Sequence, residues 1–202
     1  MNLQQLQETF DDYLSRCGVP FLTRQDMARL RATPATKAVD DWWADDLPSL
    51  LLLGGVGTGK TVAACAALAK NWRTWSTFML EPGDMPPQYA WRSGVFVDMA
   101  DLAGRGLFDS DGKLTLHRAR EAALAILDDT GRERGDGAQA LEDVFMARFA
   151  AGRKTIITAN LSIENVKERL GARVIDRIQG NGRIVSTGAE SLRGMGPRNN
   201  GR

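Results

Sequence analysis

A glycine-rich stretch over residues 54–61 limits the folds open to this chain more tightly than its length or composition does. Four consecutive leucines precede it at 50–53, a pattern typical of a strand that is buried on both faces. The residues that fit the spacing G-x-x-x-x-G-K-[ST] are Gly54, Gly59, Lys60 and Thr61. An alanine-rich segment typical of a helix follows over 62–70. A strand, a glycine loop and a helix in this order are the context in which the spacing indicates a P-loop.

The chemistry of phosphate binding explains why these residue types stand at these positions. Glycines let the backbone curl until successive N–H groups point inward at a polyphosphate, and the following helix adds the positive end of its dipole. Lys60 is expected to contact the β- and γ-phosphates of ATP, and the Thr61 hydroxyl to ligate Mg²⁺. The predicted nucleotide-binding residues here are Gly54, Gly55, Val56, Gly57, Thr58, Gly59, Lys60, Thr61 and Val62. The alternative is a glycine-rich turn with an ordinary surface lysine, which the flanking strand and helix disfavour.

The bulk composition is that of an ordinary globular protein. The chain has 202 residues, of which 43% are hydrophobic and 25% charged, enough for one domain with a substantial core. The net charge of +1 gives no overall basic field, so any contact with nucleic acid must be local. Two distant cysteines and a single histidine provide no zinc-ligand set. Because no apolar segment has membrane-spanning length and no signal segment is visible, we expect a cytoplasmic protein without membrane contact.

Hydrophobic periodicity predicts strands that alternate with helices along the chain. The expected strands cover residues 50–53, 94–98, 124–129, 154–159 and 183–187. The expected helices cover residues 3–16, 24–31, 36–44, 62–70, 99–107, 114–123, 138–151, 163–170 and 172–178. This alternation predicts an α/β fold with a parallel sheet, whose ligands bind at the carboxyl ends of the strands. We expect a helical extension over 1–47, a nucleotide-binding domain over 48–193 and a disordered tail over 194–202.

Two carboxylates end one of the predicted buried strands. Asp128 and Asp129 follow the apolar run at 124–127, where a P-loop enzyme keeps its second metal-binding element. Asp128 is expected to hold Mg²⁺, directly or through water, and Asp129 to orient or deprotonate the attacking water. The alternative is a pair of strand-end carboxylates that only form a turn. The P-loop upstream favours the metal and water roles.

Two further sets of polar residues follow in the chain. Asn160 lies just past the strand at 154–159, where an amide can hold the attacking water against the γ-phosphate or merely cap the chain. Arg169, Arg173 and Arg177 are spaced four apart and share one face if their helix is continuous. They form either a solvated basic face or a source of an arginine finger for a neighbouring subunit's γ-phosphate. The residues alone leave both alternatives open.

The N-terminal helix and an aromatic cluster also have two interpretations each. The helix expected over 3–16 is amphipathic, so it packs on its own domain or docks in a groove of a partner. The aromatic cluster mixes rings with cations, as base-stacking surfaces do, although tryptophans more often pack in cores. Its members are Trp72, Arg73, Trp75, Trp91 and Arg92.

Taken in order, these motifs resemble those of the DnaC/IstB-like AAA+ ATPases, which are helicase loaders and transposition helper ATPases. The segments that carry the resemblance are GGVGTGKT at 54–61, ILDDTG at 126–131, TIITANL at 155–161 and LGARVIDRI at 170–178. Gly18-Val19-Pro20, ahead of the domain, is also similar to the family. The resemblance covers roughly residues 17–193, and the four-part order is more specific than any one part. It implies a P-loop AAA+ parallel sheet flanked by helices, with a minimal or absent lid domain.

The resemblance also implies roles for particular residues. Asn160 matches the sensor asparagine of the family, and Arg177 matches the arginine finger supplied to the neighbouring subunit. Arg193 resembles a degenerate second-sensor arginine that contacts the nucleotide. Residues 97–108 resemble the helix with which loaders and initiators grip single-stranded DNA, and Arg105 is the expected contact. Family members form ATP-dependent spirals and engage a hexameric replicative helicase, so a homo-oligomer and that helicase are the expected partners.

The chain departs from the family pattern in two places. Bacterial loaders usually carry a separate N-terminal helicase-binding domain, whereas about 20 residues precede Gly18 here, so the first helix is a minimal substitute or the partner differs. Residues 75–93 resemble an insertion of open role. The leading hypothesis is a Mg-ATP-dependent helicase loader in phage or mobile-element replication. The alternatives are an IstB-like helper acting on target DNA, a small-molecule P-loop kinase, and an ATP-bound scaffold without turnover.

Overall fold

The computed structural model describes residues 3–78, 94–132, 136–188 and 190–192, and the predictions for 194–202 and most of the predicted insertion lie outside them. Its centre is a five-stranded sheet in the order β2-β3-β4-β1-β5, in which every pairing is parallel. The strands are β1 (Ser49–Leu53), β2 (Gly94–Asp98), β3 (Leu124–Thr130), β4 (Lys154–Ala159) and β5 (Gly182–Ser186). The predicted parallel α/β sheet is therefore confirmed. Among the described residues, no helix has both the length and the apolar character needed to cross a membrane.

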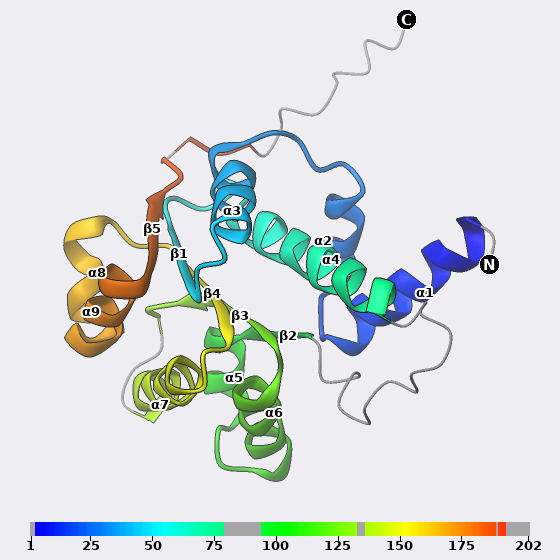
Figure 1. The fold of residues 1–202 in the computed structure, drawn as a ribbon. Helices are drawn as coiled ribbons and strands as arrows, with labels where there is room; N and C mark the ends of the chain where they lie inside the picture. Colours follow the sequence, from blue (N-terminus) through cyan, green and yellow to red (C-terminus); the bar gives the residue numbers. More distant parts are fainter. Residues whose placement is uncertain (1–2, 79–93, 133–135, 189, 193–202) are drawn as a thin grey trace, which may run out of the picture.

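Helices cover both faces of the sheet, which makes three layers (Figure 1). One face carries α1 (Leu3–Arg16), α2 (Phe21–Met27), α3 (Pro34–Ala44) and α4 (Lys60–Phe78). The other face carries α5 (Met99–Arg105), α6 (Ser110–Glu121), α7 (Asp136–Ala150), α8 (Ile163–Leu170) and α9 (Ala172–Asn181). Each layer encloses its own hydrophobic core against the sheet.

The four leucines of β1 show why this strand lies inside the sheet. Leu50 and Leu52 belong to the core beneath α1, α3 and α4, whereas Leu51 and Leu53 belong to the core beneath α7 and α9. All four are at most 1% exposed. Successive side chains of a strand point to opposite faces, so only a strand covered on both sides can bury an unbroken apolar run. The P-loop that follows β1 therefore begins at the carboxyl edge of a fixed strand.

The N-terminal helices share a core with the sheet. Tyr13 and Leu14 of α1 and Trp42 of α3 are buried with residues of α4, and Trp42 is fully enclosed. Arg183 of β5 also forms ion pairs with Asp41 and Asp45 at the end of α3, the latter at 2.6 Å. From residue 10 onward the first helix thus packs on its own domain, and its docking on a partner stays a prediction.

Several helix boundaries differ from those that the periodicity predicts. The helix expected over 24–31 runs from Phe21 to Met27, with Pro20 at its N-cap position. The helix expected over 114–123 begins at Ser110, because the Asp109 side chain accepts a hydrogen bond from the Gly112 N–H and caps it. The P-loop helix continues to Phe78 and takes in residues expected to form its connection. A local side-chain cap thus accounts for the start of α6.

A buried cation joins α7 to α6 and β4. The guanidinium of Arg148 is fully enclosed and donates to the carbonyls of Ala119, Ala122 and Lys154 and, at 2.9 Å, to the Thr155 hydroxyl. Burial lowers the pKa of Arg148 to about 9, so the group stays charged at neutral pH. The first two carbonyls lie at the C-terminal end of α6, where the helix dipole favours a cation. Arg148 therefore supplies side-chain donors to the backbone carbonyls of Ala119, Ala122 and Lys154.

We expect Arg148→Met to lower the free energy of unfolding by about 2–4 kcal/mol, because it leaves several buried carbonyls without donors. Urea denaturation followed by circular dichroism measures this change. Lys167→Ala, at an exposed position of α8, serves as the control and should shift stability by no more than about 0.5 kcal/mol. A variant as stable as the wild type would show that water or a rearranged backbone replaces the guanidinium.

Candidate active site

The P-loop connects β1 to α4 through a backbone that glycines make accessible. Gly54, Gly57 and Gly59 adopt φ angles of +147°, +83° and +84°, conformations that side chains with a Cβ rarely adopt. A Cβ at Gly54 would also lie 2.4 Å from the Thr187 hydroxyl oxygen. Glycine is therefore required at the first position of the motif for two separate reasons, backbone conformation and close approach.

A segment after β5 holds the P-loop from the side; we call residues 187–188 and 190–192 the C-terminal strap. The hydroxyl oxygens of Thr187 and Thr58 lie 2.9 Å apart, within hydrogen-bonding distance. The Gly55 N–H donates to the Gly188 carbonyl at 3.0 Å, and the Leu192 N–H donates to the Gly57 carbonyl at 2.9 Å. These residues are about 130 positions apart in the sequence, and no motif in the sequence indicates the contact.

The motif lysine is enclosed by oxygens. The Nζ of Lys60 donates to the carbonyls of Gly54 at 2.9 Å and Gly55 at 2.7 Å, and to the Asn160 Oδ1 at 2.9 Å. The residue is only 5% exposed. Burial lowers the pKa of the Lys60 ammonium, and the carboxylates of Asp128 and Asp129 oppose that shift. The predicted sensor asparagine and the predicted phosphate-binding lysine therefore touch directly.

Asp128 and Thr61 form the candidate metal site. The Thr61 hydroxyl donates to both carboxylate oxygens of Asp128, at 2.9 and 3.1 Å, and the Thr158 hydroxyl donates to one of them at 2.6 Å. Burial raises the pKa of Asp128 to about 6, although the hydrogen bonds from the two threonines oppose the shift. Carboxylate and hydroxyl oxygens are ligands that Mg²⁺ favours, so the residues fit the ion.

The protein supplies only part of a metal coordination shell. In the described ranges, no cluster of three or more His, Cys, Asp or Glu side chains could hold a metal ion. Mg²⁺ in phosphoryl-transfer sites usually takes its remaining ligands from substrate phosphates and water. The Asp128–Thr61 pair therefore suits a metal that arrives with a nucleotide.

Asp129 lies in an unusual backbone conformation. Its φ angle is +50°, and the pairing of β3 with β4 shifts register between Leu127 and Thr130. Irregular strand ends of this kind occur beside active sites, where they redirect a side chain. One Asp129 oxygen accepts from the Asn160 amide, and the other accepts from Arg132 at 3.1 Å. The structure thus brings together the predicted group of Lys60, Asn160, Asp129 and Asp128.

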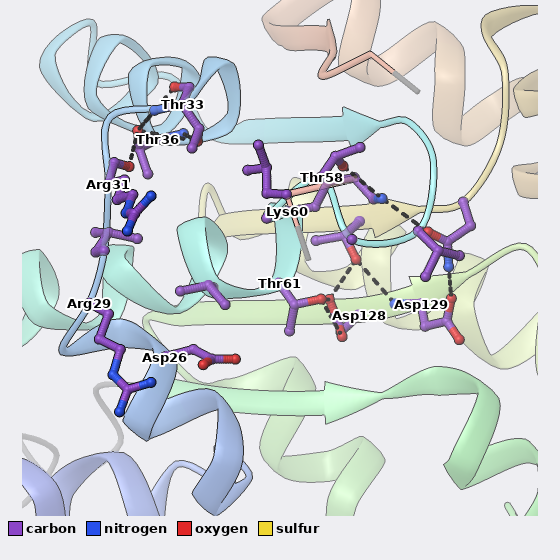
Figure 2. A pocket seen from close by; sticks show the side chains of 18 of the residues that line it. Asp26, Arg29, Arg31, Thr33, Thr36, Thr58, Lys60, Thr61, Asp128 and Asp129 are labelled. Carbon is purple, nitrogen blue, oxygen red and sulfur yellow. Dashed lines mark hydrogen bonds between the residues drawn. The ribbon is translucent and has the colours of Figure 1, made fainter. Parts of the chain in front are cut away.

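A cleft of about 1360 Å³ opens beside these residues (Figure 2). Residues 56–62 of the P-loop line it together with Asp128, Asp129 and Asn160. The opposite wall comes from the connection between α2 and α3, which contains none of the predicted site residues. The residues from this region and the neighbouring helix ends are Asp26, Arg29, Leu30, Arg31, Ala32, Thr33 and Thr36. Figure 2 labels Asp26, Arg29, Arg31, Thr33 and Thr36, which lie to one side of Lys60 and Thr61. These residues carry no motif that could have identified them.

One local sequence pattern does determine the backbone of part of this wall. The Thr33 side chain accepts from the Thr36 backbone N–H at 3.1 Å, and the Thr36 hydroxyl accepts from the Thr33 N–H at 2.8 Å. This reciprocal capping box starts α3, two residues before the expected position, with Pro34 in its first turn. The threonine pair could be found in the sequence as a helix start, but its place beside the P-loop could not.

Other predicted site residues lie away from the cleft or outside the described chain. Arg177 is exposed on α9, with its guanidinium 5.7 Å from the centre of the Phe149 ring. Arg105 is exposed on α5 and forms an ion pair with Asp101 at 2.7 Å. Neither lines the cleft. Arg193 lies outside the described residues, so its contact with nucleotide stays a prediction.

The aromatic cluster is only partly described. Trp72 is partly buried against the core, with its ring centre 5.3 Å from that of Phe10. Trp72 therefore packs in the core, which is the alternative to base stacking. Trp91 and Arg92 lie outside the described residues, as do most of the other residues predicted to form the insertion.

Comparisons with known proteins support the fold. No protein-family model and no curated protein sequence matches the chain. A crystal structure of the DnaC helicase loader superposes with a TM-score of 0.51 and 21% identity, over 76% of this chain and 85% of that chain. A crystal structure of DnaI gives a TM-score of 0.58 and 18% identity, over 79% and 82% of the two chains. AMPPCP-bound DnaA from Aquifex aeolicus gives 0.53 and 16%, over 76% of this chain and 43% of that chain.

These matches define the class of protein at the level of architecture. The chain has the P-loop α/β fold of helicase loaders and of the replication initiator DnaA, as the order of its motifs predicts. It spans less than half of the DnaA chain that it matches, but more than four fifths of the DnaC and DnaI chains. The resemblance to the DnaC-like AAA+ ATPases is therefore confirmed for the fold.

We expect Gly54→Ala to weaken ATP binding by at least about tenfold, because a Cβ at this position collides with the C-terminal strap and strains the backbone. Gly180→Ala, at an open helical position of α9, is the matched control and should leave ATP affinity unchanged. Titration with a fluorescent ATP analogue measures both. Equal affinity in the two variants would show that the P-loop adopts another conformation with nucleotide.

We expect Asp128→Asn to stabilise the protein in metal-free buffer. Because the pKa of Asp128 is raised to about 6, the folded protein binds more protons than the unfolded chain between about pH 4 and pH 6. The stability penalty therefore grows as pH rises through that window and is complete above it. Near neutral pH the variant should gain about 1–3 kcal/mol in urea denaturation with EDTA, and clearly less at about pH 4.5. A variant less stable than the wild type at neutral pH would contradict this account.

Proposed function

We propose that the protein is a Mg-ATP-dependent helicase loader, which binds a hexameric replicative helicase and places it on single-stranded DNA during replication of a phage or mobile element. The observation that carries the ATPase part is the contact of Lys60 with Asn160, and of Asn160 with Asp129, beside the Asp128–Thr61 pair. These groups come from three neighbouring strand ends and meet at one wall of the cleft. The packing of helices on strands does not by itself require these polar side chains to contact one another.

Each group has a role that its chemistry supports. The P-loop amides and Lys60 bind the phosphates, while Thr61 and Asp128 hold Mg²⁺, which neutralises charge on the phosphates when bound. Asp129 accepts the proton of the attacking water or orients that water, and Asn160 holds the water on the side facing the γ-phosphate. The wall between α2 and α3 provides the remaining surface for the nucleotide.

A shared site between subunits is the second part of the proposal. Arg177 is exposed and lies outside the cleft of its own subunit, where its only charged contact among the described residues is a long one of 3.9 Å to the neighbouring Asp176, so its guanidinium can approach another subunit's γ-phosphate. Its contact with the Phe149 ring would orient α9 for this approach. An arginine that completes the site of its neighbour would make hydrolysis depend on an ATP-dependent homo-oligomer.

The replication role is supported by the named structural neighbours. They comprise helicase loaders and DnaA, and one DnaA structure contains both AMPPCP and single-stranded DNA, with a TM-score of 0.54 and 15% identity. In this chain, α5 is the proposed DNA-binding helix, and Arg105 lies on its exposed side. A pull-down with the replicative helicase would separate the loader from the alternative of a transposition helper ATPase.

The test of the shared site mixes two inactive variants. Arg177→Ala subunits keep an intact cleft but lack the finger, whereas Lys60→Ala subunits lack the phosphate-binding lysine but keep the finger. ATPase activity should fall at least about 10³-fold in each pure variant, and an equimolar mixture should recover roughly a quarter of wild-type turnover per subunit. That fraction follows because half of the subunits have an intact cleft and half of those face a subunit that carries Arg177.

The double variant Lys60→Ala/Arg177→Ala is the control, because it matches Lys60→Ala in its cleft but supplies no finger. Mixing it with Arg177→Ala subunits should restore nothing. If the first mixture also restores nothing, despite normal ATP binding and assembly, the arginine does not act between subunits. Single-stranded DNA added to the wild type should raise turnover, and Arg105→Ala should reduce that stimulation.

A further inference from the structure

Arg132 occupies a position beside the candidate active site that the proposed function does not use. Its guanidinium donates to the Asp129 Oδ2 at 3.1 Å, from a side chain that is 68% exposed. The residue lines the nucleotide cleft and also a second, smaller hollow of about 550 Å³ beside α5. Arg132 thus contacts, with a largely exposed side chain, the carboxylate that would activate water.

The contacts around Asp129 occupy both of its carboxylate oxygens. The Asn160 amide donates to Oδ1, and Arg132 donates to Oδ2. The Asn160 Oδ1 in turn accepts from the Lys60 ammonium. Lys60, Asn160, Asp129 and Arg132 therefore form one continuous chain of hydrogen bonds that is satisfied by the protein alone.

The four residues of this hydrogen-bonded series differ in how firmly the fold holds them. Lys60 is buried, and Asn160 follows directly after β4, whose pairing with β1 fixes its backbone. Arg132 instead lies on an exposed turn, three residues after Asp129 and one after Gly131, which has a φ angle of +87°. The small residues Ala100, Ala103 and Gly104 line the adjacent hollow and leave room for a displaced guanidinium. Of the two side chains that donate to Asp129, Arg132 therefore belongs to a turn, whereas Asn160 directly follows a paired strand.

We propose that Arg132 is a positioning residue that holds Asp129 in a resting arrangement and so limits basal ATP hydrolysis. A carboxylate that accepts from a guanidinium has fewer lone pairs free for the attacking water, and its negative charge is partly neutralised. Breaking the ion pair returns one oxygen of Asp129 to the water. The inference rests on the proposed ATPase activity, because Asp129 has nothing to activate without it.

The test compares steady-state ATPase kinetics of the full chain with and without the guanidinium. Arg132→Ala should raise kcat by about two- to fivefold, the range that the strength of an exposed ion pair allows, with the KM for ATP unchanged. Arg132→Lys should return kcat close to the wild-type value, because an ammonium can donate to the same Oδ2. Lys37→Ala breaks another ion pair with an exposed cation, to Asp41 in α3 at 2.7 Å, and should change neither parameter.

The outcomes separate the two proposals. If the wild type hydrolyses ATP and Arg132→Ala is equally fast or slower, the restraint is overturned and the ATPase proposal stands. If the wild type and Arg132→Ala both bind a fluorescent ATP analogue without turning it over, the ATPase proposal fails, and the restraint fails with it. Should Arg132→Ala lose thermal stability, Arg132→Met keeps a long unbranched side chain that neither carries charge nor donates to Asp129; it is expected to show the same rise in kcat, and a wild-type rate would overturn the inference.

Discussion

The burial of β1 between two layers of helices is the constraint from which the site geometry follows. Leu50 to Leu53 are enclosed on both faces, so the strand cannot shift register without exposing apolar side chains. Parallel pairing of β1, β3 and β4 then brings their carboxyl ends to one edge of the sheet. Lys60, Asp129 and Asn160 consequently meet although they are far apart in the chain. The hydrophobic core thereby sets the positions of the polar groups above it.

The polar groups at this edge are arranged at some cost to stability. Asp128 is held almost fully buried, and its raised pKa reflects the unfavourable desolvation of a carboxylate. Lys60 is similarly desolvated and is compensated by carbonyl oxygens. A metal and a triphosphate would supply the opposite charges that these two groups lack. The site is thus better matched to a bound Mg-nucleotide than to its own isolated state, which is a common property of functional centres.

Both ends of the described chain complete the cleft. The connection between α2 and α3 forms one wall, and the C-terminal strap holds the P-loop through Thr187, Gly188 and Leu192. Ion pairs of Arg183 with Asp41 and Asp45 tie α3 to β5. Substitutions near either end of the described chain can therefore affect the P-loop without changing a residue of its sequence motif.

The sequence by itself determined the P-loop, the alternation of strands and helices, and the chemical identity of the polar strand ends, because glycine conformation, hydrophobic periodicity and strand-end carboxylates are local properties. It did not determine where α2 starts, nor the start of α6, which Asp109 caps, nor the placement of residues 29–33. Contacts such as Thr187 with Thr58 and Leu192 with Gly57 depend on the tertiary structure. They depend on how distant segments and turns pack in three dimensions, and no local pattern of residues encodes that packing.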